Sequence, residues 1–444
     1  VGSRYDGVVV GEVVAVNPHP GADRLQLCRV NDGRREVDVV CGAPNVAVGQ
    51  KAPLACVGAH LPNGMKLRET RIRGERSRGM LCAEDELGWS DDHSGIMILP
   101  ADLEPGTPLA EVLGGPEKVL NVEITWNRSD CLSILGMARE VAALYRVELH
   151  WPEVNVDETG ADIEDMISVA IEAPGACPRY TARGIRGVEI RPSPLWVQRR
   201  LLLCGVRPIN NIVDVTNYVM LESGHPLHAF DHARLKGSRI VVRPAREGER
   251  MATLDEVERT LTPDTLLIAD AERPVAVAGV MGGAGSEIGE DTRDVLLESA
   301  CFDPAAIHAT SVRLGLSTES SYRFERGVNV GTVDWAGHRA AALMAAWGGG
   351  SVAPGMVDAY PGRTEPRRVS VRFDRTRALL GMDVSDEEIV SALEALAIPV
   401  EERSDKGCRV EVPTFRRDIE IEADLIEEVA RLHGLDKVPE IAPL

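Results

Sequence analysis

The chain has 444 residues, a formal net charge of −20 at pH 7, 44% hydrophobic residues and only 4% aromatic residues. This length exceeds what one hydrophobic core supports, so we expect about three or four domains. No apolar run reaches the roughly 18 residues of a membrane-spanning helix, and no signal peptide is recognised. Nine scattered cysteines without CxxC spacing favour reduced thiols in a cytoplasmic protein over a disulfide framework or a zinc site. The start at Val1, without methionine, suggests a fragment.

The N-terminal stretch has the pattern of a small β-barrel. Short strand-like segments at 7–13, 25–31, 36–41 and 51–55 alternate with turns rich in Gly, Pro and Asn. Further strand-like pieces follow around Met80 and at 96–99. We expect this barrel to end near residue 115, at the sequence GGP.

A basic segment lies inside this acidic chain. The net charge argues against a nucleic-acid partner, because phosphate binding depends on Lys and Arg. Local charge matters more, however, and residues 66–78 hold six basic residues against two acidic ones. The segment is either an ordinary solvated strand and loop or a surface that follows a phosphate backbone. The six candidates for contacts with such a phosphate backbone are Lys66, Arg68, Arg71, Arg73, Arg76 and Arg78.

The middle of the chain mixes predicted helices and strands. Apolar residues at helical spacing predict a helix over 132–146, with Asp130 as its N-cap. The acidic stretch 152–165 has no clear period, which indicates a linker. Strand-like text resumes at residue 167, and a further helix is predicted over 333–347.

The last block has the element order of a winged-helix-like module. Ser385 and Glu388 form a candidate capping box at the start of a helix. A hairpin with its turn at 405–407 follows, and then a final helix over 422–433. Helix, hairpin and helix in this order are typical of a winged-helix-like fold.

Acidic residues crowd the start of this final helix. Residues 424, 427 and 428 have i, i+3 and i+4 spacing and share a helix face, with Asp418 just upstream. From the residues alone, a solvated acidic face is favoured, with Glu427 pairing with Arg431. The other interpretation is a magnesium site, because hard oxygen ligands suit that ion.

Two N-terminal strings resemble a known domain. VVVGEVVAVNPHPGADRLQLCRVNDG and GERSRGMLCAEDELG resemble the tRNA-binding OB domain of several synthetases and of free-standing tRNA-binding proteins. These two strings alone leave both kinds of protein open.

Four later strings decide between them. RPINNIVDVTNYVMLESGHPLHAFD, VAGVMGGAGSEI, LLESACFDP and GLSTESSYRFERG resemble the β subunit of bacterial phenylalanyl-tRNA synthetase, in the same order and at similar separations. The resemblance implies a multidomain α+β fold without the family's first few dozen residues, its catalytic-like core and its anticodon-binding domain. The implied parts are an OB-fold domain (1–118), a split structural domain with linker (119–190), a mixed α/β editing domain (191–362) and a winged-helix-like domain (367–440).

The same resemblance implies an editing pocket. In this family the α subunit charges tRNA(Phe), and the β subunit hydrolyses tyrosyl-tRNA(Phe). Glu298 is expected to accept the tyrosine hydroxyl, and His228 to orient water or the terminal ribose. Without the resemblance, His228 is more often a packed core histidine, Glu298 a rim charge and the sequence GGAG a turn. The expected pocket residues are Thr216, Asn217, His228, Gly282, Glu298, Thr318 and Ser320, where the family commonly has alanine at Ser320.

The resemblance also implies partners and cofactors. It assigns Asp418, Asp424, Glu427 and Glu428 to a magnesium site facing the α subunit, within an (αβ)2 enzyme that uses ATP and phenylalanine. No DNA or membrane partner is expected, and this chain alone is not expected to aminoacylate. The rival hypotheses are a stand-alone hydrolase of mischarged tRNA and a non-catalytic tRNA-binding scaffold for the α subunit.

Overall fold

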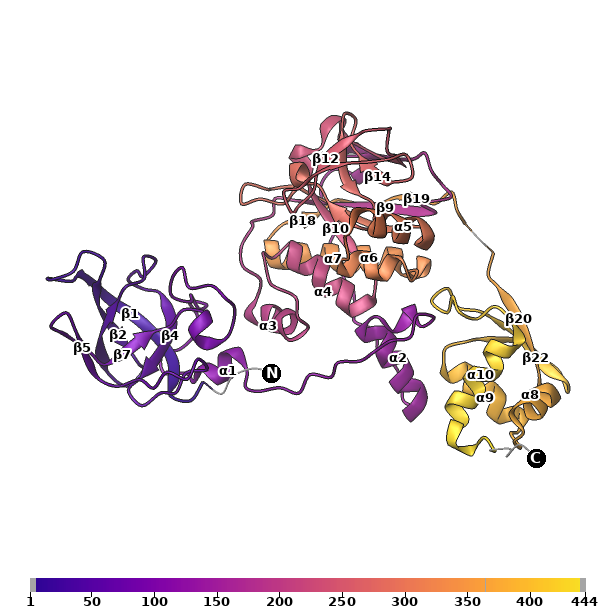
Figure 1. Cartoon of the computed structure of the whole chain (residues 1–444), viewed down its shortest axis with the longest axis horizontal. Helices are drawn as coiled ribbons and strands as arrows, with labels where there is room; N and C mark the ends of the chain where they lie inside the picture. Colours follow the sequence, from indigo (N-terminus) through magenta and orange to yellow (C-terminus); the bar gives the residue numbers. More distant parts are fainter. Residues whose placement is uncertain (1–4, 364, 440–444) are drawn as a thin grey trace. The chain divides into compact units, whose positions relative to one another are not determined.

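A computed structural model describes residues 5–363 and 365–439. The chain separates into two compact units, shown with their elements in Figure 1. The first unit comprises residues 1–121 and 194–208, and the second comprises 122–193 and 209–444. No helix in the described residues is long and apolar enough to cross a membrane.

The first unit is built on a nearly closed, barrel-like antiparallel sheet with strand order β3-β2-β1-β4-β7. Its long strand β1 pairs with both β2 and β4, and an irregularity between Val13 and Ala15 allows it to bend. Gly11 lies at the tightest point of this strand, where a Cβ would be 2.8 Å from side-chain atoms of Leu54 and Val30. The sheet strands are β1 (Val8–Pro18), β2 (Gln26–Asn31), β3 (Glu36–Cys41), β4 (Lys51–Cys56) and β7 (Gly79–Leu81).

Two helices complete the first unit. Helix α1 (Leu109–Leu113) follows the strands of the barrel-like sheet. Helix α3 (Leu195–Leu203) returns to this unit from much later in the chain, and Leu195 and Leu202 pack against its core. The sequence did not predict this return.

The second unit contains two five-stranded sheets. In the first sheet, β10, β17, β9 and β18 follow in order, and β19 also pairs with β9. The second sheet has the order β16-β15-β14-β11-β8. The strands are β8 (Ser168–Ile171), β9 (Arg179–Arg186), β10 (Leu227–Asp231), β11 (Arg239–Pro244), β14 (Leu266–Ala269), β15 (Pro274–Val277), β16 (Met281–Gly282), β17 (Val295–Cys301), β18 (Ser351–Val352) and β19 (Val357–Ala359).

Strand β17 is buried along its whole length, and its two faces have different neighbours. Val295 and Leu297 pack in a cluster with residues of α4 (Val213–Ser223) and α7 (Val333–Gly348). Leu296 and Ala300 pack in the other cluster, with residues of the second sheet. Because side chains alternate along a strand, Glu298 belongs to the face that is turned toward the second sheet.

The C-terminal part of the second unit has a small sheet with order β20-β22-β21 and three helices (Figure 1). Its core includes Ile389, Leu393, Val410 and Leu425, together with Ala143 of helix α2. The elements are α2 (Ile134–Tyr145), β20 (Arg368–Arg372), α8 (Phe373–Leu380), α9 (Asp386–Ala395), β21 (Val400–Arg403), β22 (Gly407–Glu411) and α10 (Glu422–His433).

Of the two capping predictions made from the sequence, one is confirmed and one is wrong. The capping box of Ser385 and Glu388 at the start of α9 is confirmed. The prediction that Asp130 caps α2 is wrong, because the Ser133 side chain accepts the Gly136 N–H instead. Asp130 forms an ion pair with Arg128. Strand β20 and helix α8 were not predicted.

Candidate functional site

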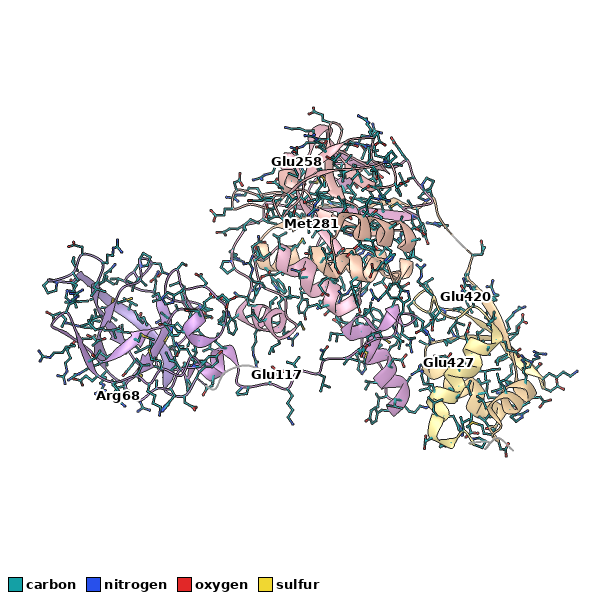
Figure 2. The ribbon with its side chains drawn as sticks, viewed as in Figure 1. Arg68, Glu117, Glu258, Met281, Glu420 and Glu427 are labelled. Carbon is teal, nitrogen blue, oxygen red and sulfur yellow. The ribbon has the colours of Figure 1, made fainter. Side chains whose placement is uncertain are left out.

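A cavity of about 300 Å³ in the second unit contains the predicted pocket residues. Its walls come from α4, β10, β17, the β14–β16 side of the second sheet and the start of helix α6 (Glu319–Phe324). Met281, labelled in Figure 2, also lines it. Residues predicted from five separate sequence segments therefore meet in one place. All seven line the cavity: Thr216, Asn217, His228, Gly282, Glu298, Thr318 and Ser320.

His228 and Glu298 are neighbours across two strands. They lie directly opposite each other in the antiparallel pairing of β10 with β17. Side chains at paired positions lie on the same face of a sheet, so both groups are directed to one side. This register explains how residues 70 positions apart in the chain come to share the cavity.

Burial controls the charge of Glu298. The residue is 5% exposed, and desolvation raises the pKa of its carboxyl to about 8. A hydrogen bond donated by the Tyr180 hydroxyl to Oε2, at 2.9 Å, acts in the opposite direction but is the weaker influence. Glu298 is therefore largely neutral at pH 7. Tyr180 was missed by the sequence analysis, because its position in β9 showed only a strand pattern.

His228 is also held neutral. Burial lowers the pKa of its imidazole to about 4. Its ring lies edge-on to Phe230, with 4.5 Å between ring centroids. A Cβ at Gly282 would be 2.5 Å from Cε1 of His228, so glycine is needed for the ring to lie where it does. A neutral imidazole can accept one hydrogen bond and donate another.

The hydroxyl groups of the cavity wall are largely committed to the protein backbone. Thr216 Oγ1 donates to the carbonyl of Val213 at 2.7 Å, and Thr318 Oγ1 donates to the carbonyl of Val280 at 2.9 Å. Ser320 Oγ donates to the carbonyl of Gly279 at 3.2 Å. In the described part of the chain, the Asn217 amide has no hydrogen-bond partner, which leaves it free to bind a ligand.

A larger cavity of about 500 Å³ lies elsewhere in the second unit. Its lining includes Arg139, Trp151, Trp335 and Phe415, and it contains none of the predicted site residues. Arg139 lies over the ring of Phe415, 4.1 Å from its centroid. This cavity lacks a carboxylate or histidine, whereas the smaller cavity has both.

Three family models match separate parts of the chain. They are the B3/4 domain at residues 176–349, the tRNA synthetase B5 domain at 369–435, and the "Putative tRNA binding domain" at 8–108. The phenylalanine–tRNA ligase beta subunit of Geobacter sulfurreducens is 50% identical over 443 residues, covering 100% of this chain and 55% of that protein. The beta subunit of Salinibacter ruber is 49% identical, covering 99% of this chain and 55% of that protein.

The chain belongs to the family of phenylalanine–tRNA ligase beta subunits. It spans about half the length of the curated relatives that it matches. Among solved structures, this chain is similar to an N-terminal fragment of the Pyrococcus horikoshii phenylalanyl-tRNA synthetase beta subunit. The aligned region covers 70% of this chain and 85% of that fragment, with 18% sequence identity and a TM-score of 0.37. The cavity described above lies within the residues that match the family's B3/4 domain.

The six basic candidates lie within the match to the tRNA binding model, around a short hairpin in the first unit. Strands β5 (Thr70–Ile72) and β6 (Glu75–Ser77) form this hairpin. Arg76 and Arg78 both form ion pairs with Glu69. The other four are exposed and form no ion pair in the part of the chain that the structure describes: Lys66, Arg68 (Figure 2), Arg71 and Arg73.

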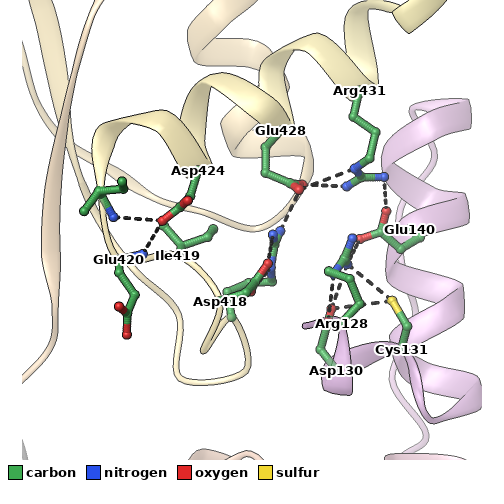
Figure 3. Close-up of polar contacts among 12 residues, drawn as sticks. Arg128, Asp130, Cys131, Glu140, Asp418, Ile419, Glu420, Asp424, Glu428 and Arg431 are labelled. Atoms are coloured by element: carbon green, nitrogen blue, oxygen red, sulfur yellow. Dashed lines mark hydrogen bonds and ion pairs between the residues drawn. The ribbon is translucent and has the colours of Figure 1, made fainter. Parts of the chain in front are cut away.

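The four predicted magnesium ligands lie within the match to the B5 domain, but they do not form one group. Arg416 donates to both oxygens of Asp418, at 2.9 and 2.7 Å, and also to Glu428 at 3.0 Å. Figure 3 labels these two carboxylates. Asp424 accepts the backbone N–H groups of Glu420 and Ile421, which begin the turn before α10. Glu427 is exposed on α10 (Figure 2).

The prediction of a shared solvated face therefore fails for Glu428. This side chain is buried, and Arg431 pairs with Glu428 and Glu140 rather than with Glu427. As arranged here, the residues do not fit a single magnesium site with four carboxylates, because arginines already neutralise Asp418 and Glu428. A second acidic group, formed by Asp130, Cys131 and Glu140, also surrounds an arginine, Arg128 (Figure 3).

Proposed function

We propose that this chain is the tRNA-binding and editing part of a phenylalanyl-tRNA synthetase β subunit. It binds tRNA(Phe) and hydrolyses tyrosyl-tRNA(Phe), as part of a cytoplasmic (αβ)2 enzyme in which the α subunit joins phenylalanine to tRNA(Phe) with ATP. The single observation that carries the editing assignment is the cavity that brings all seven expected residues together around buried Glu298.

A second site is useful for a physical reason. Tyrosine is phenylalanine with one added hydroxyl, and an apolar pocket rejects an added hydroxyl only about 100-fold. A cavity that offers the hydroxyl a buried hydrogen-bond partner can instead require it, because phenylalanine would leave that partner unsatisfied. Glu298 is the buried polar group that supplies this requirement here.

The remaining cavity residues position the reacting groups. An aminoacyl ester is already activated, so the site has mainly to hold the ester and a water molecule in line. The neutral His228 imidazole accepts a hydrogen bond from that water or from the terminal ribose. The Asn217 amide binds polar atoms of the substrate, and Gly282 leaves space beside the imidazole.

The family resemblance also supports a division of the chain into domains. We propose an OB-fold domain at 1–118, a split structural domain at 119–190, an editing domain at 191–362 and a winged-helix-like domain at 367–440. Of the six basic candidates between residues 66 and 78, the four without ion pairs are the strongest candidates for contacts with tRNA phosphates.

The editing assignment is tested by deacylation assays with tyrosyl-tRNA(Phe) and phenylalanyl-tRNA(Phe), using the full chain alone and with the α subunit. We expect Glu298→Ala to lower the preference for the tyrosyl ester roughly 10- to 100-fold, the worth of a buried hydrogen bond. Glu247→Ala, in an exposed turn, is the matched control and should retain the preference. Unchanged preference in a folded Glu298→Ala protein would refute the assignment.

Two observations would favour the rival functions. A cavity that binds tRNA but hydrolyses neither ester, with or without the α subunit, would make the chain a scaffold. Hydrolysis that is unaffected by the α subunit would favour a stand-alone hydrolase.

Magnesium binding by Asp418, Asp424, Glu427 and Glu428 stays a prediction. Asp424 and Glu427 have no bond to arginine in the described residues, so they are the ligands available without rearrangement. Calorimetric titration with magnesium, with and without the α subunit, measures the site. We expect heat of binding only in the assembled complex, and Glu427→Gln should reduce it. No heat in either case would remove the site.

A further inference from the structure

The editing cavity contains one carboxyl group whose two oxygens have different surroundings. Glu298 Oε2 receives the hydrogen bond from Tyr180, which is fully buried. Oε1 has no hydrogen-bond partner in the described residues, yet it does not appear among their fully buried unpartnered atoms. Since Glu298 lines the cavity, Oε1 is the oxygen that is open to a ligand.

Tyr180 itself does not line the cavity. It lies on β9, next to β17 in the sheet, and its ring packs in the same core cluster as Phe230 and Leu296. Only its hydroxyl reaches a group of the site. Its influence on a substrate must therefore pass through Glu298.

We propose that Tyr180 is a specificity-determining positioning residue, which fixes Glu298 so that Oε1 alone presents its hydrogen-bonding capacity to the substrate's phenol. This inference rests on the proposed editing function and adds a residue to it. The Tyr180 hydroxyl forms a hydrogen bond with one oxygen of the carboxyl, and the phenol of the mischarged tyrosine forms a hydrogen bond with the other.

The geometry also assigns the proton of the neutral carboxyl. A neutral carboxyl has one O–H donor and one carbonyl acceptor. Because Tyr180 donates to Oε2, Oε2 is the acceptor and the proton is on Oε1. The O–H of Glu298 then points into the cavity and donates to the phenolic oxygen of the substrate, which is the opposite direction to the one expected from the family resemblance. Phenylalanine has no oxygen at that position, so it leaves this donor without a partner.

The groups around Glu298 do not compete for this role. The titratable groups beside it in the described residues are Tyr180 on β9, His228 on β10 and Cys177 just before β9. Glu319 of α6 also lines the cavity, and its carboxylate pairs with Arg323. Burial keeps Tyr180, His228 and Cys177 neutral near pH 7, since it raises the pKa values of Tyr180 and Cys177 and lowers that of His228. The charge state of Glu298 is therefore the one that changes near neutral pH.

The test is Tyr180→Phe in the full chain, which keeps the ring in the core and removes only the donor. We expect the ratio of tyrosyl to phenylalanyl ester hydrolysis to fall on the order of tenfold, in line with the loss of one hydrogen bond. The apparent pKa in the pH dependence of that ratio should rise, because the hydrogen bond from Tyr180 favours the charged form of Glu298. Adding Tyr180→Phe to Glu298→Gln should change the ratio little, as expected for residues that act together.

Tyr360→Phe is the matched control, because the Tyr360 hydroxyl makes no hydrogen bond within the described residues and Tyr360 does not line the cavity. A second readout does not depend on hydrolysis: the infrared carbonyl band of protonated Glu298, assigned by difference from Glu298→Gln, should shift in Tyr180→Phe. Unchanged selectivity and pH profile in an active Tyr180→Phe protein would overturn this proposal and leave the editing function intact. Absence of hydrolysis in the wild type would overturn the editing function. In that case the infrared measurement still tests Tyr180, because an unshifted carbonyl band would show that Tyr180 does not bond to Glu298.

Discussion

Glu298 and Glu428 are both buried in the second unit, at 5% and 4% exposure, yet they are held in opposite charge states. Among the described residues, the Glu298 carboxyl forms a hydrogen bond only with a tyrosine hydroxyl, and burial raises its pKa to about 8. Glu428 meets two arginines, Arg416 and Arg431, which overcome the effect of burial and lower its pKa to about 2. A buried carboxylate without a cation becomes a neutral hydrogen-bonding group, whereas one with cations becomes a structural anchor.

This difference separates the two candidate sites by chemistry. A neutral carboxyl in a cavity can discriminate between a phenol and a phenyl ring. A carboxylate that is held by arginines has little remaining capacity for a metal ion, and its ion pairs join α10 to α2 through Arg431 and Glu140. The predicted editing residues therefore line one cavity within this chain, whereas the predicted magnesium ligands do not form one group.

The largest expected effect comes from removing the cation of the second region. Arg416→Met leaves the buried Glu428 and the partly buried Asp418 without the arginine that they share, and we expect a loss of about 3–5 kcal/mol in the free energy of unfolding. Urea denaturation measures this loss. Arg409→Met, which breaks the exposed pair with Glu402, is the matched control and should cost at most about 1 kcal/mol. Equal losses in the two variants would mean that Arg416 does not hold the region together.

The next effect is a pair of opposite pH dependences. The pKa of Glu298 is raised on folding, so its contribution to stability is fully present below pH 4.5 and is lost as pH rises toward 8. The pKa of Glu428 is lowered, so its contribution is present above pH 4.5 and is lost as pH falls toward 2. We expect Glu298→Gln to gain stability relative to wild type by a few kcal/mol between pH 5 and 9.

Glu428→Gln should show the reverse, with a deficit relative to wild type that shrinks between pH 5 and 3. Denaturation midpoints measured across both pH ranges give, for each variant, the slope of its stability difference from wild type against pH. Slopes of the same sign would show that the cations around Glu428 do not control its charge. A flat difference for Glu298→Gln would show that its carboxyl is charged in the folded protein.

The sequence predicted the cavity better than it predicted the acidic region. The seven cavity residues belong to strings whose joint pattern resembles one family, and the strand register brings them together. The four acidic residues of the predicted magnesium site were grouped mainly by helical spacing. That spacing places Glu427 and Glu428 on one face but cannot show which of the two side chains is buried. In the structure Arg431 links Glu428 to Glu140 of helix α2, which lies nearly 300 residues earlier in the chain.

Two further residues were missed for the same physical reason. Tyr180 and Arg416 act through contacts with residues whose proximity depends on strand pairing or loop geometry. Neither carries a local signal, since a tyrosine in a strand and an arginine in a loop are both ordinary. The return of α3 to the first unit has no local signal either.

The smallest effect concerns Ser320, a cavity residue at whose position the family resemblance leads us to expect alanine. Ser320 adds a hydroxyl where alanine is common. If that hydroxyl made the surroundings of Glu298 polar, the difference in charge state between Glu298 and Glu428 would be smaller. Its hydroxyl donates to the carbonyl of Gly279 instead. We therefore expect Ser320→Ala to change the ratio of tyrosyl to phenylalanyl ester hydrolysis by less than about threefold and to cost about 1 kcal/mol of stability, the worth of one hydrogen bond. A change of tenfold or more in that ratio would mean that the hydroxyl turns into the cavity, and that Glu298 shares its selectivity with Ser320.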